Sequence, residues 1–237
     1  MQKILSFIVL SMIMMGSALA AINQQCPQHT AYGAPIHQAQ AGDQELCKVN
    51  YAVIHSCTKK NPIAVMEHIT TEAISGPATR RDDFREDAAV HAQCRSRLQD
   101  YAGQPYDRGH MSAAAGNTQN DAIMSESFFL SNMVPQVPNN NRGIWRILEM
   151  QIRDQVKTTG QSLYVISGAI FAPGHQTIGQ GVGVPTHLYK VIINKNSGNA
   201  TAYLMPNAAL PVADLPRYRT TVQAVEQATG MRFPVKQ

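Results

Sequence analysis

Long apolar runs are absent from this 237-residue chain beyond its first twenty residues, so no later segment is predicted to span a membrane. Internal repeats and low-complexity stretches are absent too, which argues against a repeat or fibrous protein. The charge is nearly balanced, because 20 Lys and Arg residues face 16 Asp and Glu residues and leave a formal net charge of +4. Such a mild excess allows a polyanionic ligand without requiring one.

The first twenty residues have the pattern of a cleaved export signal. Lys3 precedes an apolar run from Ile4 to Met15 that is too short to cross a bilayer, and the stretch ends in the small residues Ala18-Leu19-Ala20. We therefore expect residues 1–20 to be a signal peptide, and the protein to be exported, either periplasmic or secreted. The remaining residues, 21–237, suit a single domain with a core large enough to fold alone.

The four cysteines contain no Cys-x-x-Cys pair, which disfavours a zinc site without excluding it. An even number of cysteines in an exported chain is typical of disulfides. An extended strand between Cys47 and Cys57 would hold them roughly 30 Å apart, whereas a disulfide needs Cα atoms within about 7 Å. Pairing of these two is therefore the least favoured. The residues predicted to form two disulfides are Cys26, Cys47, Cys57 and Cys94.

Strand patterns occur in two parts of the chain. Residues 49–55 and 63–69 predict a hairpin, because a turn-rich basic segment joins them. The preceding stretch, 21–46, shows no period and is expected to be a loop-rich arm. Largely apolar segments later in the chain predict three strands of a sheet, at 162–169, 188–194 and 201–205. The first two of these are expected to be central strands that are buried on both faces.

Helical periodicity occurs after residue 140 and near the C-terminus. Four apolar residues recur at three- and four-residue steps before a glycine, and they predict a helix that buries Trp145 in the core: Trp145, Leu148, Ile152 and Val156, followed by Gly160. A second amphipathic helix is predicted over 218–229. Together these elements predict an α+β fold with a mixed or antiparallel central sheet flanked by helices.

Three short segments bring chemically active side chains together in the chain. The first, Tyr106-Asp107-Arg108-Gly109-His110, belongs to a strand predicted over 106–111. The second, Asn132-Met133-Val134-Pro135-Gln136, belongs to a strand expected to open at 128–130. The third runs from Asn141 to Glu149 and enters the helix. A histidine, an asparagine and a glutamate separated by polar loops are typical of a site rather than of a core.

These segments, taken in register, resemble the DNA/RNA non-specific endonuclease family over roughly residues 45–235. The resemblance implies a ββα-metal, or His-Me, finger as the active site. It also implies an enzyme that hydrolyses phosphodiester bonds of both DNA and RNA and leaves 5′-phosphates. With the signal peptide, the prediction is an exported nuclease of this kind. No membrane partner is expected, and the oligomeric state is not predicted.

On this resemblance, His110 is the general base and must be neutral to accept a proton. Asn141 is the single direct ligand of Mg²⁺, with Mn²⁺ as a possible substitute, although asparagine is also favoured as a helix N-cap without any metal. Glu149 follows Asn141 by eight residues, roughly 12 Å along an ideal helix. It is therefore expected to hold metal-bound waters rather than to share the ion.

Several arginines precede the histidine. The family places a phosphate-contacting arginine in a Thr-Arg dipeptide, which Thr79-Arg80 matches, and Arg81 is the second candidate. Arginine suits this role because its planar fork binds two phosphate oxygens and stays charged. The alternative is that both arginines only pair with neighbouring aspartates. Arg108 is expected either to touch phosphate or to brace its loop, and Asn132 to position the histidine loop or the substrate.

Two other functions remain open at the level of sequence. One is an exported protein that binds or takes up nucleic acid with the same fold but little catalysis, and the other is an exported phosphodiesterase for another substrate such as a lipid. The presence of His110, Asn141 and Glu149 disfavours the first. The lack of an amphipathic anchor helix disfavours the second.

Overall fold

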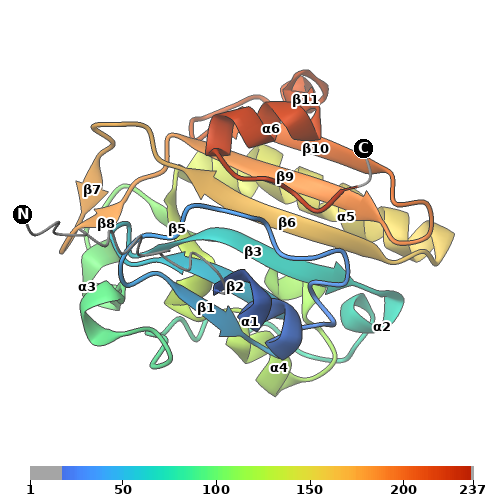
Figure 1. Ribbon diagram of the computed structural model, residues 1–237, viewed down its shortest axis with the longest axis horizontal. Helices are drawn as coiled ribbons and strands as arrows, with labels where there is room; N and C mark the ends of the chain where they lie inside the picture. The colour runs from blue at the N-terminus through green and yellow to red at the C-terminus, as the bar shows by residue number, and fades with distance from the viewer. Residues whose placement is uncertain (1–17, 236–237) are drawn as a thin grey trace, which may run out of the picture.

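A seven-stranded sheet runs through the centre of the described part of the chain, residues 18–235 of a computed structural model (Figure 1). Every neighbouring pair of strands in it is antiparallel. The predicted α+β class is confirmed, and the sheet is the antiparallel alternative. In order across the sheet, the strands are β1 (Gln44–Cys47), β2 (Tyr51–Ser56), β3 (Asn61–Ile69), β6 (Leu163–Ile170), β9 (His187–Asn194), β10 (Ala200–Pro206) and β11 (Arg219–Thr220).

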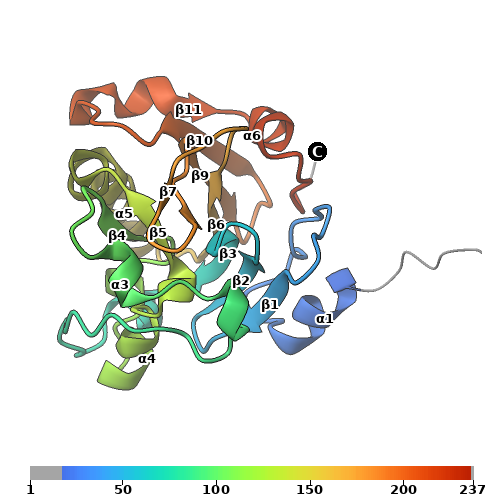
Figure 2. The ribbon, with the colours of Figure 1, turned by 90° about the vertical axis from the view of Figure 1, so that its left-hand side faces the viewer.

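Both faces of the sheet are buried, as the composition of its central strands predicts. Side chains alternate between faces along a strand, so Leu163 and Val165 of β6 pack in one hydrophobic cluster while Tyr164 and Ile166 pack in the other. The helices that accompany the sheet are α1 (Ala18–Gln25), α2 (Thr71–Ile74), α3 (Leu98–Tyr101), α4 (Asp121–Glu126), α5 (Arg146–Thr159) and α6 (Val222–Thr229). Figure 2 shows α3, α4 and α5 on one side of the sheet and α1 and α6 on the other.

The predicted finger lies on the α5 side. It pairs β4 (Asp107–His110) with β5 (Met133–Gln136), and the chain then passes through a π-helical turn, Asn140–Trp145, into α5. A Cβ atom at Gly109 would stand 2.6 Å from Cβ of Gln136, so this hairpin requires glycine at that position. As predicted, α5 ends at Gly160, whose φ of 65° is left-handed.

Three boundaries differ from the sequence predictions. The arm at 21–46 is not wholly irregular, because it holds α1 and the short strand β1, which pairs with β2. The second finger strand starts at Met133 rather than at 128–130, where Phe128 packs in the core instead. The last helix starts at Val222 rather than at 218, because 212–218 form a 3₁₀ helix and 219–220 form β11.

Two disulfides join the arm and the loop before the finger to the sheet. They link Cys26 to Cys47 and Cys57 to Cys94, so the least favoured pairing, Cys47 with Cys57, does not form. Strand β2 separates those two residues, as expected. Because all four cysteines are in disulfides, a cysteine zinc site is excluded.

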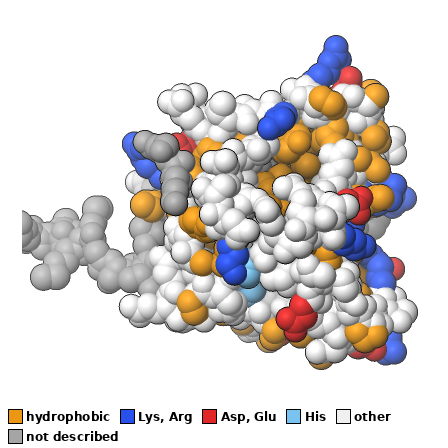
Figure 3. Space-filling view, turned by 90° about the vertical axis from the view of Figure 1, so that its right-hand side faces the viewer, with side chains coloured by type: hydrophobic (Ala, Val, Ile, Leu, Met, Phe, Trp, Pro, Cys, Tyr) orange, Lys and Arg blue, Asp and Glu red, His pale blue; other side chains and the backbone are white. Residues whose placement is uncertain are grey.

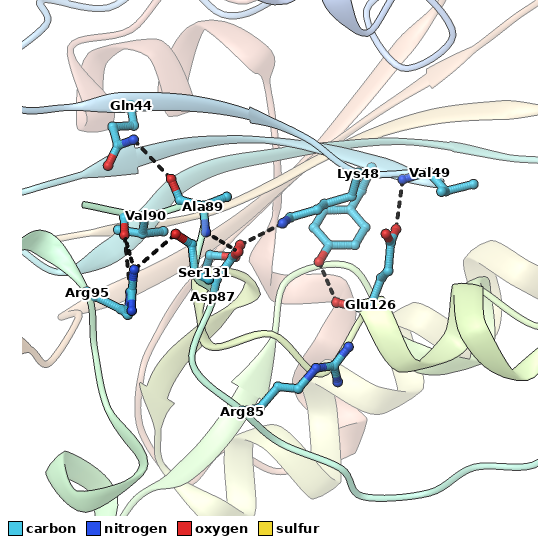
Figure 4. A network of polar contacts seen from close by, with 12 residues as sticks. Gln44, Lys48, Val49, Arg85, Asp87, Ala89, Val90, Arg95, Glu126 and Ser131 are labelled. Carbon is cyan, nitrogen blue, oxygen red and sulfur yellow. Dashed lines mark hydrogen bonds and ion pairs between the residues drawn. The ribbon is translucent and has the colours of Figure 1, made fainter. Parts of the chain in front are cut away.

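A buried ion pair beside the first disulfide connects the arm to the finger (Figure 4). The ammonium of Lys48 lies 2.8 Å from Asp87, which also accepts hydrogen bonds from the Ser131 hydroxyl and the Ala89 backbone N–H. Burial by itself would raise the pKa of Asp87, but the hydrogen bonds from Lys48 and Ser131 outweigh it and the pKa lies below its usual value. Ser131 directly precedes Asn132 and β5, so this contact fixes the start of the second finger strand.

The signal peptide predicted over 1–20 falls largely outside the described residues. Within 18–235, no helix combines the length and the apolar character needed to cross a membrane.

Candidate active site

A cleft of about 790 Å³ opens above the finger, and it brings together most of the predicted site residues. Strand β4, the π-helical turn and α5 supply one side, and the loop around residues 80–84 supplies the other. The site residues predicted from sequence that line it are Arg80, Arg108, His110, Asn141 and Glu149.

His110 forms the floor of this cleft and is 9% exposed. The rings of Phe84 and Phe128 meet the imidazole edge-to-face, with centroids 5.6 Å and 5.0 Å away. The indole N–H of Trp145 donates to the His110 carbonyl over 3.2 Å, so the π-helical turn that precedes α5 holds the histidine strand. Trp145 is otherwise buried in the core, as predicted.

The surroundings of His110 favour the neutral imidazole. Burial, followed by the positive charges of Arg80 and Arg108, lowers its pKa to about 3. Among the described residues, nothing hydrogen-bonds to its buried Nε2 atom. A neutral ring in an open cleft is able to accept a proton from a water molecule at ordinary pH.

Asn141 is held by Asp107 rather than by the helix end. Its side-chain N–H donates to a carboxylate oxygen of Asp107 over 2.8 Å, and Arg142 forms a two-pronged ion pair with the same carboxylate at 2.6 and 2.8 Å. Because a carboxylate only accepts hydrogen bonds, this contact leaves the amide oxygen of Asn141 to face elsewhere. The N-cap alternative is wrong, since Asn141 lies inside the π-helical turn and α5 starts at Arg146.

Glu149 projects from the first turn of α5 into the same cleft. Its side chain is 13% exposed, and its Oε1 atom has no hydrogen-bond partner among the described residues, although Lys190 stands 3.8 Å away. Burial raises the pKa of Glu149, while Lys190 and Arg153 oppose that effect.

These two side chains suit a hard divalent cation. Mg²⁺ prefers oxygen ligands and keeps most of its waters. The cleft is lined by Asn141, whose amide oxygen could bind the ion directly, and by Glu149, whose carboxylate could accept hydrogen bonds from the metal-bound waters. In residues 18–235 no group of three or more His, Cys, Asp or Glu side chains could form a denser metal site. The donor set therefore fits the sparse Mg²⁺ site that the sequence predicts.

The two candidate phosphate-binding arginines, Arg80 and Arg81, line different hollows. Arg80 lines the cleft with its guanidinium 2.8 Å from Asp82 and 5.1 Å from the ring centroid of Phe128. Arg81 lies 3.6 Å from Asp121 and faces a different hollow. Arg108 lines the cleft and stacks on Phe84 at 4.1 Å, so contact with phosphate and bracing of the loop are both open to it.

Asn132 lies outside the cleft, fully buried behind β4. Its amide exchanges two hydrogen bonds of 2.8 Å with the backbone of Ser112 and donates a third to the Ser127 carbonyl. Its own carbonyl accepts the N–H of Met111 over 3.0 Å. This geometry fits the positioning of the histidine loop and not contact with substrate.

Sequence reasoning missed further charged residues of the site. Three arginines of the finger also line the cleft: Arg142, Arg146 and Arg153. Their spacing, which places them on one helical face, could have predicted that they lie together. Beneath the cleft lie Glu67 of β3 and Lys190 of β9, which are 5% and 1% exposed. A charged residue inside an otherwise apolar strand was the signal for each of these.

Positive charge gathers in the cleft. On the face shown in Figure 3, Lys and Arg side chains stand mostly apart from one another and hydrophobic side chains gather in the upper half. The cleft that His110 lines is, by contrast, lined by five arginines and three acidic residues. Such a groove suits a chain of phosphates.

Comparison with known proteins assigns this arrangement to a family. The profile described as DNA/RNA non-specific endonuclease matches residues 29–236. Human mitochondrial endonuclease G is 35% identical over 200 residues, which are 78% of this chain and 67% of that protein. Nuclease C1 of Cunninghamella echinulata var. echinulata is 35% identical over 185 residues, 70% of this chain and 73% of that protein. Human mitochondrial nuclease EXOG is 32% identical over 237 residues, 92% of this chain and 61% of that protein.

A solved structure has the same fold. The crystal structure of an EndoG/EndoGI complex superposes with a TM-score of 0.78 at 29% identity, covering 92% of this chain and 93% of that one. The match reaches further into the N-terminal arm than residue 45, where the sequence resemblance was expected to begin. Fold, finger and family agree, and the chain thus belongs to the DNA/RNA non-specific endonuclease family and is a nuclease.

Proposed function

We propose that this protein is an exported, sugar-non-specific endonuclease that hydrolyses phosphodiester bonds of DNA and RNA with the help of Mg²⁺. The observation that carries the proposal is the meeting of His110, Asn141 and Glu149 on one ββα finger in a cleft lined by arginines. Membership of a nuclease family supports action on nucleic acids.

His110 acts as the general base in this proposal. The neutral ring takes a proton from the attacking water, and the backbone contacts of Trp145 and Asn132 keep the strand that carries it in place. Attack on phosphorus expels the 3′ oxygen and leaves a 5′-phosphate on the product.

Arg80 and Arg108 balance the growing negative charge on the phosphate oxygens. Asn141, oriented by Asp107, would bind the Mg²⁺ ion directly, and Glu149 would hold the waters bound to it. When bound, that ion supplies a further positive charge beside the phosphate and an acidic water for the leaving oxygen.

Lack of sequence preference follows from the type of contact. Arginines that contact phosphates do not read the identity of the bases. Arginine and alanine are the most frequent residues among those that line the cleft. Action on RNA as well as DNA is inherited from the family description.

Export is supported by the pattern of residues 1–20 and by the two disulfides, which persist in oxidising compartments. The names of human endonuclease G and EXOG place those relatives in mitochondria and lend no support to export. Fractionation of the producing cells, with N-terminal sequencing of the protein, tests this part. An intact Met1 in the cytosolic fraction would contradict it.

The activity is tested by incubating purified protein with circular plasmid DNA and with total RNA, in Mg²⁺ and in EDTA. We expect both polymers to be cut only with Mg²⁺, and end-labelling to find 5′-phosphates. Cleavage that persists in EDTA would remove the metal from the mechanism. Binding of DNA without cleavage would favour the alternative function, capture or uptake of nucleic acid.

A further inference from the structure

A buried charge lies directly beneath the proposed site. Lys190 occupies the middle of β9, and its side chain is 1% exposed. Taking an ammonium group out of water is unfavourable unless the group is paired and hydrogen-bonded. An apolar side chain would fill this space without that cost, so the buried ammonium indicates a role beyond packing.

The partners of Lys190 belong to both halves of the finger. Its ammonium donates to the Met111 carbonyl over 3.4 Å, one residue after His110, and lies 3.8 Å from the Glu149 carboxylate on α5. It also lies 4.3 Å from the ring centroid of Trp145, whose indole holds the His110 carbonyl. The Ser167 hydroxyl on the neighbouring strand, 2.6 Å away, completes the set.

Glu67 braces the same region from β3. Its carboxylate accepts a hydrogen bond of 2.7 Å from the hydroxyl of Ser112, two residues after His110. Glu67, Glu149, Lys190 and Arg153 line one small cavity, so these four ionisable side chains form a single cluster. The cluster contacts both the end of the histidine strand and helix α5. Of its four members, Glu149 and Arg153 also line the open cleft, whereas Glu67 and Lys190 do not.

We propose that Lys190 is a positioning residue for phosphodiester cleavage, because its ammonium fixes the Glu149 carboxylate relative to the strand that carries His110. This inference rests on the proposed function. Without the ammonium, the Glu149 carboxylate loses its nearest cation and turns away from the place where Mg²⁺ would bind. Loss of such a supporting contact typically weakens metal binding about 10–100-fold.

The test compares Lys190→Met, which keeps the length of the side chain and removes the charge, with Val191→Ala. Val191 is the next residue of β9, fully buried in the cluster on the opposite face, so its truncation measures simple destabilisation. Thermal melting establishes the folded fraction, Mn²⁺ binding followed by electron paramagnetic resonance reports the metal site without turnover, and cleavage of plasmid DNA gives kcat and KM.

For Lys190→Met we expect folded protein with Mn²⁺ affinity and kcat each lowered about tenfold or more, and with KM for DNA nearly unchanged. For Val191→Ala we expect a lower melting temperature with unchanged Mn²⁺ affinity and kcat. In a Glu149→Gln background, Lys190→Met should cause almost no further loss of Mn²⁺ affinity, because it acts through Glu149. Unchanged Mn²⁺ affinity in Lys190→Met, or equal losses with and without Glu149, overturns the inference.

Three further outcomes decide between the inference and its alternatives. If Lys190→Met does not fold, Lys190→Gln decides: it keeps a hydrogen-bond donor but removes the charge, and Mn²⁺ affinity equal to wild type would overturn the inference. If the wild-type protein fails to cut any nucleic acid, the proposed function fails, and the inference fails with it as a statement about catalysis. Wild-type cleavage with full activity of Lys190→Met would sink the inference alone.

Discussion

The neutral state of His110 has a consequence for stability that needs no substrate to measure. Burial, and then the charges of Arg80 and Arg108, lower the pKa of this ring to about 3, whereas an unfolded histidine titrates at about 6.5. Between these values the unfolded chain binds a proton that the folded protein does not. Stability is therefore lost as pH falls below about 6.5, at about 1.4 kcal/mol per pH unit. At pH 5 the loss from this group reaches about 2 kcal/mol.

Replacement of His110 by glutamine isolates that contribution. The free energy of unfolding is measured in urea at pH 7 and pH 5 for both proteins. The pKa values of three other histidines are also lowered by burial, but they are present in both proteins and cancel in the comparison: His29, His55 and His68. We expect the wild type to lose about 2 kcal/mol relative to His110→Gln between the two pH values.

An NMR titration of the imidazole signal that vanishes in His110→Gln gives an independent value, and it should show no protonation above pH 5. A stability difference that is the same at pH 7 and pH 5, together with an NMR midpoint near 6.5, would refute the assignment of a low pKa. The general base would then be largely charged in mild acid.

Three other substitutions follow from contacts in the fold and the cleft. Arg80→Ala should lower kcat for cleavage of plasmid DNA severalfold or more, because Arg80 lines the cleft. Arg81→Ala should leave this cleavage nearly unchanged, because Arg81 faces another hollow. Equal effects of the two substitutions would contradict this difference. Gly109→Ala should destabilise the hairpin by about 1–3 kcal/mol in a urea melt, since the new Cβ meets Gln136; an unchanged melt would show that the hairpin yields freely. Lys48→Met leaves Asp87 buried without its cation and should lower the free energy of unfolding by about 3 kcal/mol in the same assay at pH 7. A loss below about 1 kcal/mol would mean that the hydrogen bonds from Ser131 and Ala89 are enough to stabilise the buried carboxylate.

Local patterns were enough to predict the elements that carry strong periodicity. The stripe that contains Trp145 and Val156 is one face of a helix, and Gly160 ends it in the left-handed conformation that favours glycine. The apolar runs that became β6 and β9 read as buried strands because neither face of the sheet meets solvent. In these segments the local sequence and the tertiary fold demand the same residues.

The rest depends on contacts between distant parts of the chain. Strand β1 has four residues and one buried side chain, so only its pairing with β2 defines it. The difference between Arg80 and Arg81 arises because Asp121, forty positions later in the chain, faces Arg81 in space. Helix α5 starts after a π-helical turn that Asp107 and Asn141 help to hold, and periodicity carries no signal for such a turn.

The charged residues beneath the site were missed for a related reason. Lys190 and Glu67 each interrupt an apolar strand, and from sequence alone either could have faced solvent at an edge. Only the sheet order, which places β3, β6 and β9 side by side under the finger, shows that both are buried beside Glu149.

The measurement that tests the central claim most directly is cleavage of plasmid DNA in Mg²⁺ by wild-type protein and by His110→Ala, with and without added imidazole. Loss of a general base lowers the rate at least about a hundredfold, and we expect that loss together with partial recovery when free imidazole enters the space left above Phe128. Equal rates for the two proteins would contradict the assignment of His110 as the base. A loss that imidazole does not restore, accompanied by a lower melting temperature, would indicate a structural role for this ring instead.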